Sequence, residues 1–439
     1  LSEALAVRER FGKDESFHAS VPPDAVVTPH TTEEVSRIVT VCAEHRVPVI
    51  PYGTGTALEG HVAALHGGIS INLQEMNQVV ELHAEDLDVV VQPGVTRKQL
   101  NNSPRDCGLF FRIDPGADAS IGGMAACRAS GTNAVRYGTM RENVLALTVV
   151  LADGRVIQTS RRARKSAAGY DLTRLFVGSE GTLGVITEVT LRLYGIPEAI
   201  SSAVCTFPDV DSAVNTVITT IQYGVPIARI ELLDEAQVDA INQYSKTDLT
   251  VAPTLLLEFH GTDQGVKEQA EIVQEIAVDS GGSNFQWTTN TEERNRLWQA
   301  RHDAAYACKA LRPGGEIWAT DVCVPISRLA ECIRETQQDI RDFGLFAPIV
   351  GHVGDGNFHL CLLVGKDDPA ESKKANELHE RMVMRALGMG GTCTGEHGVG
   401  YGKLDFLVAE HGEAISVMRS IKQALDPDNI MNPGKVLRV

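Results

Sequence analysis

A change in sequence pattern near residue 198 constrains the fold of this chain most strongly. Residues 85–195 contain many short β-branched runs separated by glycine turns, which is typical of a sheet-rich domain. After this region, predicted strands alternate with amphipathic helices at about 211–223, 264–279 and 328–343. The alternation predicts an α+β domain built from split βαβ units. Because 439 residues are too many for one hydrophobic core, we expect two domains, 1–197 and 198–439.

The composition excludes several classes of partner. The formal net charge is −17, which argues against nucleic acid and against an anionic membrane surface but would suit a basic protein. The longest apolar runs, such as residues 144–152, are about half the ~20 residues that a transmembrane helix needs. Nine cysteines without a CxxC pattern favour free, buried thiols over a disulfide framework.

The first glycine-rich segment is "PYGTGTALEGH" (51–61), between a predicted βαβ unit and a further strand. A dinucleotide fingerprint that starts at Gly53 would need glycine at 58 and a helix after it, but Leu58 and a strand follow. A Walker loop would need Gly-Lys-Ser/Thr, and Gly60-His61 does not match. An ordinary glycine turn remains open here, as does a loop whose bare backbone approaches a pyrophosphate.

Two later segments favour a flat ligand. Residues 115–138, "PGADASIGGMAACRASGTNAVRYG", are dense in glycine, alanine and serine, which allows the backbone to lie against a ring system. Residues 178–193, "GSEGTLGVITEVTLRL", form a third such loop that runs into a predicted strand. The order and spacing of these segments resemble the flavin-binding domain of the vanillyl-alcohol oxidase and p-cresol methylhydroxylase family. The C-terminal "LDPDNIMNPGKVL" (425–437) is similar to the closing signature of that family's lactate-type branch.

The resemblance implies a fold class and a cofactor. We expect an α+β protein with a two-subdomain FAD-binding domain, an α+β substrate (cap) domain with an antiparallel sheet, and a tail, 425–439, that returns to the flavin. Aligning the glycines places Ala57 where some relatives carry a histidine tether, so we expect non-covalent FAD. The implied FAD-binding residues are Pro51, Tyr52, Gly53, Thr54, Gly55, Thr56, Pro115, Gly116, Ser120, Gly122, Gly123, Ser130, Gly131, Tyr137, Gly138, Glu180, Gly181, Gly184, Val185, Ile186 and Asn432.

Two histidines lie seven residues apart in "HVGDGNFHL" (352–360), between two runs of strand formers. With Asp355-Gly356 at the tip of a two-residue hairpin, His352 would lie opposite His359. Their Cβ atoms would then be about 5 Å apart on one face, close enough for two imidazoles to share one cation. Two unrelated histidines on a β-ribbon are the alternative interpretation.

A second loop, "GGTCTGEHGVGYG" (390–402), contains Glu396 and His397 between glycines. Two histidines and one carboxylate are a common catalytic metal set. Histidine can also act as a general base beside a metal-bound hydroxyl. The resemblance supports His352, His359 and Glu396 as ligands of Zn²⁺ or Mn²⁺, with His397 as the catalytic base.

Residues 296–307, "RLWQARHDAAYA", predict a helix with Trp298 and Arg301 one turn apart. An arginine offers a bidentate fork to a carboxylate, although an ordinary surface arginine is the better interpretation without the resemblance. The resemblance implies that Arg301, with Trp298 beside it, binds the substrate.

The implied function is oxidation of D-2-hydroxy acids to 2-oxo acids, with D-lactate as first choice. A hydride would pass to the FAD N5 atom and the electrons to an acceptor such as cytochrome c, in mitochondria. One alternative is D-2-hydroxyglutarate oxidation, but the stretch 316–325, with Ala319 and Thr320, lacks the lysine expected for a second carboxylate. Another is a non-redox, flavin-dependent alkyl-transfer synthase.

Overall fold

The computed structural model describes residues 1–366 and 368–439. The chain forms two compact units. Unit 1 contains residues 1–131, 138–196 and 396–439, and unit 2 contains residues 132–137 and 197–395. The boundary at 196 lies one residue from the expected one. The division differs from the expected domains at the C-terminus, because the whole segment from residue 396, and not only 425–439, belongs to unit 1.

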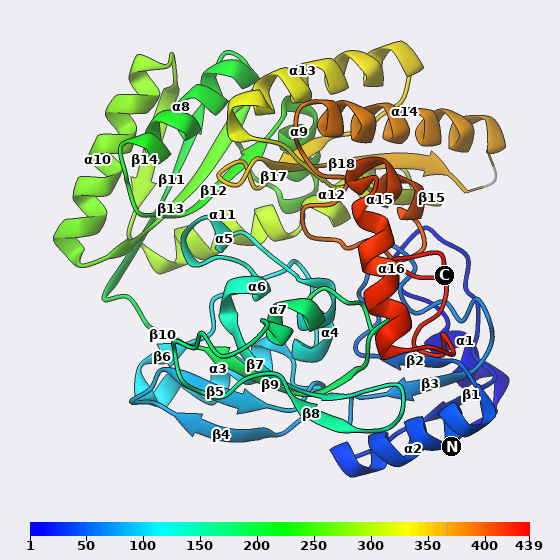
Figure 1. Cartoon of the computed structure of the whole chain (residues 1–439). Helices are drawn as coiled ribbons and strands as arrows, with labels where there is room; N and C mark the ends of the chain where they lie inside the picture. Colours follow the sequence, from blue (N-terminus) through cyan, green and yellow to red (C-terminus); the bar gives the residue numbers. More distant parts are fainter. Residues whose placement is uncertain (367) are drawn as a thin grey trace. The chain divides into compact units, whose positions relative to one another are not determined.

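Unit 1 contains two principal sheets (Figure 1). One is a parallel sheet of order β1-β3-β2, and the other is an antiparallel sheet of order β4-β5-β9-β7-β8. The strands are β1 (Ala25–Val27), β2 (Val49–Tyr52), β3 (Ile69–Asn72), β4 (Val79–His83), β5 (Asp88–Val91), β6 (Leu109–Phe110), β7 (Val144–Val150), β8 (Val156–Gln158), β9 (Val185–Arg192) and β10 (Tyr194–Gly195). The helices are α1 (Leu5–Phe11), α2 (Thr32–His45), α3 (Arg97–Asn102), α4 (Ile121–Cys127), α6 (Met140–Asn143), α7 (Leu172–Phe176), α15 (Leu404–His411) and α16 (Ala414–Leu425).

The opening βαβ unit is confirmed. Helix α2 begins after Thr31, whose side chain accepts a hydrogen bond from the Glu34 amide. The sequence of Thr31 and Glu34 fits a capping box, but only half of it forms, because the Glu34 carboxylate accepts from the His30 amide instead of the Thr31 amide. The apolar face of α2 packs on the parallel sheet, and Ile430 and Met431 of the C-terminal tail join the same core.

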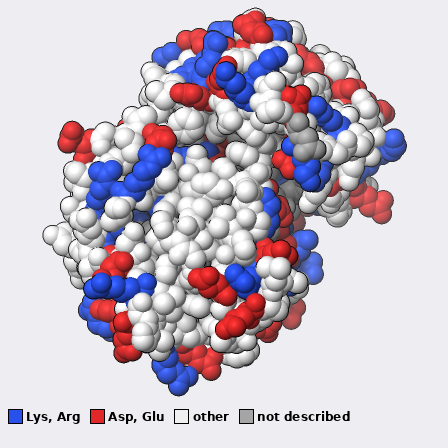
Figure 2. Space-filling model, turned by 90° about the vertical axis from the view of Figure 1, so that its right-hand side faces the viewer, with Lys and Arg blue, Asp and Glu red and all other residues white. Residues whose placement is uncertain are grey.

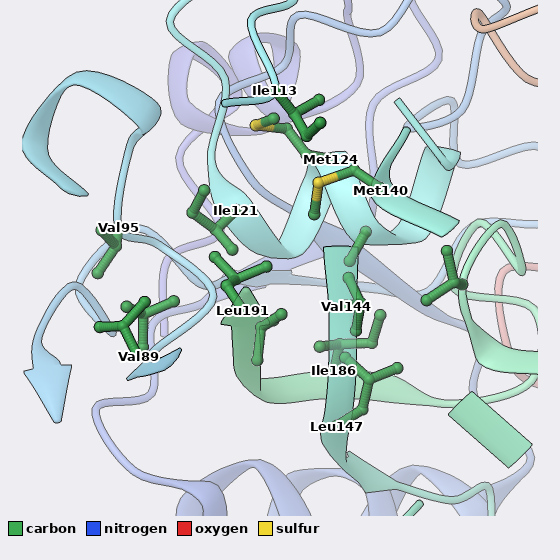
Figure 3. Close-up of a cluster of buried hydrophobic side chains, with 14 of the residues drawn as sticks. Val89, Val95, Ile113, Ile121, Met124, Met140, Val144, Leu147, Ile186 and Leu191 are labelled. Atoms are coloured by element: carbon green, nitrogen blue, oxygen red, sulfur yellow. The ribbon is translucent and has the colours of Figure 1, made fainter. Parts of the chain in front are cut away.

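The larger core of unit 1 lies between the antiparallel sheet and α4 (Figure 3). Strand residues such as Leu147 and Leu191 meet Ile121 and Met124 of α4, and all four are nearly inaccessible to water. Burial of such side chains stabilises the folded chain by about 1.5–3 kcal/mol each. The core therefore fixes the position of α4, and with it the segment 115–120 that leads into this helix.

Unit 2 is built on one long sheet of order β14-β11-β13-β12-β17-β18-β15, in which each neighbouring pair is antiparallel (Figure 1). The antiparallel substrate-domain sheet is thus confirmed. The strands are β11 (Ala199–Thr206), β12 (Ile227–Leu233), β13 (Thr254–Gly261), β14 (Ser283–Thr288), β15 (Gly315–Ala319), β16 (Val322–Cys323), β17 (Ile349–Gly351) and β18 (Asn357–Gly365). The helices are α5 (Ala134–Tyr137), α8 (Val210–Gln222), α9 (Glu235–Ser245), α10 (Asp263–Asp279), α11 (Thr291–His302), α12 (Ala304–Leu311), α13 (Ile326–Phe343) and α14 (Pro369–Gly388).

The predicted helix over 296–307 is two helices, because the chain turns at Asp303 between α11 and α12. Both pack with α9 against the sheet, in a core that includes Trp298, Cys308 and Val350. All nine cysteines are free thiols, as expected, but only six of them are buried: Cys107 is exposed, and Cys127 and Cys323 are half-buried. Among the described residues, none of the helices combines the length and the apolar character needed to cross a bilayer.

Candidate active site

The two histidines of "HVGDGNFHL" lie at one end of the β17–β18 pair. The predicted register was wrong: His359 pairs with Val350, and the Asn357 amide donates to the His352 carbonyl, so the loop is longer than two residues. The register differs from the predicted one by two positions, and a shift by two preserves the face that a side chain occupies. The histidines therefore still share a face, with ring centroids 5.4 Å apart.

Each imidazole is held at its Nδ1 atom. His352 Nδ1 lies 2.7 Å from the Glu231 carboxylate, and His359 Nδ1 lies 2.9 Å from the backbone carbonyl of Thr320. Both oxygens can only accept a hydrogen bond, so each Nδ1 is the donor. In a neutral ring the lone pair is then on Nε2. This is the usual arrangement of a metal-binding histidine.

His352, His359 and Glu396 each offer one ligand atom, and these atoms lie within 4.8 Å of one another. Glu396 directly follows Gly395, the last residue of unit 2. Two imidazoles and one carboxylate suit Zn²⁺ or Mn²⁺ and leave coordination positions for a substrate. The donor set, the fixed Nδ1 atoms and the burial of both histidines therefore fit a divalent metal.

Arg301 is buried, and its partner is Glu231. The guanidinium places Nε 2.8 Å and Nη2 2.6 Å from one carboxylate oxygen of Glu231, while the other oxygen accepts from His352. Burial alone would raise the pKa of Glu231, but His352 and Arg301 together hold this pKa below its usual value. The ion pair brings the predicted substrate arginine and a predicted metal ligand to a single carboxylate.

Trp298 is a core residue of unit 2, 5% exposed. Its indole N–H donates to the Ser202 hydroxyl at 2.9 Å, and the guanidinium of Arg229 lies over its ring at 4.6 Å. These contacts account for both the ring and its polar atom. A role of Trp298 in substrate binding stays a prediction.

The segments predicted to bind FAD meet in unit 1. Thr54 Oγ1 in the first loop accepts from the Ser120 amide at the start of α4. Asn432, in the C-terminal tail, donates to the Glu180 carbonyl at 2.7 Å. A Cβ atom at Gly53 would lie 2.2 Å from Ser120 Oγ, and one at Gly181 would lie 3.0 Å from Pro51. Larger side chains at these glycines would therefore block the approach of the loops.

The same region fits a polar cofactor such as FAD. The hydroxyls of Ser120 and Ser179 are buried and have no hydrogen-bond partner among the described residues. Buried hydroxyls normally have a partner, so these two orphaned groups mark places where a ligand is expected to bind. Tyr137 is assigned to unit 2, where its hydroxyl lies 2.9 Å from His260 Nδ1.

The Glu180 carboxylate holds the loop that follows His397. Its two oxygens accept from the amides of Val399 and Gly400, at 2.7 Å each, and it lies 3.1 Å from His61 Nε2. Burial lowers the pKa of His61, but the Glu180 carboxylate, with a smaller effect of Cys127, raises it well above its usual value. The Glu180 side chain is therefore committed to this loop, and its carbonyl accepts from Asn432, so a contact of Glu180 with FAD stays a prediction.

Sequence reasoning missed the buried carboxylate Glu231 and one buried ion pair of unit 1, Glu59 with Lys403. Glu231 lies between the buried apolar residues Ile230 and Leu232, and a carboxylate inside an apolar strand is the signal that could have identified it. Glu59 pairs with Lys403 at 3.0 Å, and both side chains are almost completely buried. No pattern in the sequence connects these two positions, which are more than 340 residues apart.

Two family models match the chain. The model described as "FAD binding domain" matches residues 23–160, and the model described as "FAD linked oxidases, C-terminal domain" matches residues 196–436. The chain therefore belongs to the FAD-linked oxidase family of flavoproteins. The fold agrees with that of p-cresol methylhydroxylase with substrate bound, at a TM-score of 0.78 and 18% identity over 99% of this chain and 93% of that one.

The curated relatives define a branch of this family. The chain is 56% identical to "Probable D-lactate dehydrogenase, mitochondrial" of Danio rerio, over 100% of this chain and 89% of the relative. It is 50% identical to "D-lactate dehydrogenase [cytochrome], mitochondrial" of Arabidopsis thaliana, over 96% and 75%. The chain belongs to the D-lactate dehydrogenase branch and is an FAD-dependent oxidoreductase.

Proposed function

We propose that this chain oxidises D-lactate to the corresponding 2-oxo acid, with FAD and a divalent metal as cofactors. The observation that carries the metal-dependent part is the cluster of His352, His359 and Glu396, in which both histidines are held at Nδ1. Membership of the D-lactate dehydrogenase branch supports the substrate. His397, next to the carboxylate ligand, is the proposed base.

In this proposal the cofactors supply chemistry that side chains lack. FAD supplies a hydride acceptor, and the metal supplies a Lewis acid that lowers the pKa of a hydroxyl. Arg301 binds the substrate carboxylate, and His397 Nε2 or Nδ1 takes the hydroxyl proton. Glu180 keeps the His397 loop in place through Val399 and Gly400. FAD is held without a covalent bond, so acid precipitation of the protein releases it.

The stretch 316–325 favours a short substrate. The Thr320 carbonyl oxygen accepts a hydrogen bond from His359, so this stretch adjoins a proposed metal ligand. It contains no lysine or arginine. A second substrate carboxylate, as in D-2-hydroxyglutarate, would be desolvated there without a cation of this stretch to pair with. D-lactate, with its methyl group, avoids this cost.

The relatives' names also support an acceptor and a compartment. Several are named D-lactate dehydrogenase [cytochrome], mitochondrial. We infer that cytochrome c accepts the electrons and that the protein acts in mitochondria. A basic cytochrome would be attracted to a chain with a net charge of −17.

Anaerobic flavin reduction tests the proposal. The purified flavoprotein is mixed with D-lactate, L-lactate or D-2-hydroxyglutarate, and the flavin absorbance is followed in a stopped-flow instrument. D-lactate should bleach the flavin fastest, and removal of metal with a chelator should slow the bleaching. Faster reduction by D-2-hydroxyglutarate would favour the dicarboxylate alternative, and no reduction by any hydroxy acid would favour alkyl transfer.

A further inference from the structure

Glu231 has no direct role in the proposed reaction, yet it is one of the most completely buried charged groups of unit 2. Its side chain is 1% exposed. A buried charge is costly unless it is paired and hydrogen-bonded. Among the residues that the structure describes, Glu231 meets this condition through His352 and Arg301 together. The buried charge of Glu231 is therefore stabilised by His352 and Arg301 acting together.

The sheet determines where this carboxylate lies. Leu232 pairs with Gly351 between β12 and β17, which places Glu231 across from His352 at the end of β17. Directly opposed residues have Cβ atoms about 5 Å apart. The 2.7 Å contact between Glu231 Oε1 and His352 Nδ1 thus follows from the backbone register.

The second carboxylate oxygen of Glu231, Oε2, binds one edge of the Arg301 guanidinium. Nε and Nη2 both point to Glu231 Oε2, and a guanidinium is planar with five N–H donors in fixed directions. Nη1 and the outer hydrogen of Nη2 form the end edge of the group, which is next to the edge that meets Glu231 and points in a different direction. That second edge has the geometry for a bidentate contact with a substrate carboxylate.

We propose that Glu231 is a positioning residue that orients the metal ligand His352 and the substrate-binding edge of Arg301 at the same time. One rigid carboxylate then links metal binding to recognition of the hydroxy acid. The inference rests on the proposed metal site and deepens it. It predicts that a change at Glu231 weakens metal binding and substrate binding together.

Glu231→Gln is the sharpest variant. A glutamine has nearly the same shape, but it offers one acceptor oxygen and one amide group that only donates. The glutamine oxygen can accept a hydrogen bond from either His352 or Arg301. The glutamine amide group then faces the other residue, which is also a donor, and no hydrogen bond forms there. Loss of such an outer partner typically lowers metal affinity tenfold to hundredfold. We expect a decrease of this size for Mn²⁺ and a higher KM for D-lactate.

The matched control is Glu258→Gln. Glu258 lies on the neighbouring strand β13, is also buried, and also pairs with a histidine and an arginine, His260 at 2.8 Å and Arg229 at 3.5 Å. Neither of these is a proposed metal ligand. This variant loses a buried carboxylate of the same kind, so it reports the general cost of the substitution. We expect its Mn²⁺ affinity to match that of the unmodified protein.

The measurement uses the whole flavoprotein after removal of metal with a chelator. Binding of Mn²⁺ is followed by electron paramagnetic resonance without substrate, beside flavin absorbance and a thermal melt. KM and kcat are then measured at saturating Mn²⁺, where a purely metal-related defect disappears and a defect at Arg301 remains as a raised KM. Glu231→Asp, which keeps the charge but is too short to reach both partners, provides the test if Glu231→Gln does not fold.

The outcomes separate this inference from the proposed function. If the unmodified protein binds neither Mn²⁺ nor Zn²⁺, the metal site and the inference are both wrong. If it binds Mn²⁺ and the Glu231 variants bind equally well, only the inference is overturned. Equal losses in the Glu231 and Glu258 variants would likewise overturn it, because the effect would then belong to any buried glutamate of this sheet.

Discussion

At the scale of single residues, the proposed role of Arg301 depends on the planar shape of its guanidinium and not only on its charge. Lysine at this position would keep a positive charge for Glu231 but would lose the planar fork. We expect Arg301→Lys to lower kcat/KM for D-lactate by roughly 10- to 100-fold, in line with about 1.5–3 kcal/mol for a hydrogen bond to a charged group. Steady-state kinetics at constant flavin content measures this change.

The control for this substitution is Arg334→Lys. Arg334 pairs with Asp211 at 2.5 Å, but about half of its side chain is exposed. Exposed ion pairs contribute little, so this variant should keep normal kinetics. Normal kcat/KM in Arg301→Lys would show that the substrate carboxylate is bound elsewhere.

At the scale of elements, the loop between β17 and β18 depends on Gly356. Its φ is +81°, and a Cβ atom there would lie 2.0 Å from the Val324 carbonyl oxygen. Gly356→Val should displace this loop and lower the metal content without altering a ligand. Gly344→Val is the control, because Gly344 has φ +63° but a Cβ atom added there would meet nothing within 4 Å. Metal analysis by mass spectrometry distinguishes the two, and full occupancy in the Gly356 variant would contradict the prediction.

Helix α9 begins with a carboxyl group that titrates near neutral pH. Asp234 accepts from the Gln237 amide at 2.8 Å, and burial raises the pKa of Asp234 to about 7. The folded chain therefore keeps a proton that the unfolded chain loses above pH ~4. The free energy of unfolding should fall as the pH rises from 4 to 7, by up to ~1.4 kcal/mol per pH unit from this group, and then become level.

Asp234→Asn removes this titration but keeps a capping oxygen. Urea denaturation of both proteins between pH 5 and pH 8 tests the assignment, because the other titrating groups cancel in the difference. The variant should be more stable than the unmodified protein at pH 8, and its advantage should shrink as the pH falls. A difference that does not change with pH would mean that Asp234 is ionised throughout.

At the scale of the whole molecule, the proposed electron transfer to cytochrome c is expected to depend on net charge. Figure 2 shows one face on which acidic and basic side chains are interspersed and neither sign forms a continuous patch. With a net charge of −17, we expect the rate constant for reduction of cytochrome c to fall as NaCl is raised, because the Debye length is only ~8 Å at 0.15 M. A neutral dye as acceptor is the control, and equal salt dependence for both would exclude electrostatic steering.

The sequence by itself determined the local features of this protein. Short β-branched runs between glycine turns identified the strand-rich region before residue 196, because such signals depend on neighbours a few residues apart. Glycine spacing and the pairing of Glu396 with two histidines were enough to suggest the flavin family and the metal set. A single sequence is therefore enough to predict sites that depend on residue types and on short spacings between them.

Only the tertiary structure decided the contacts between distant segments. It replaced the predicted two-residue hairpin by a longer loop, because the Val324 amide and the hydrogen bonds of β16 also constrain the chain there. It assigned residues 396–424 to unit 1, where the Glu180 carboxylate and the Glu59 carbonyl bind the backbone at 399–402. It also joined Glu231 to Arg301 and His352, 70 and 121 residues away. A buried carboxylate pairs with the cationic groups that lie beside it in the folded chain. Tertiary packing, and not separation in the sequence, determines which groups these are.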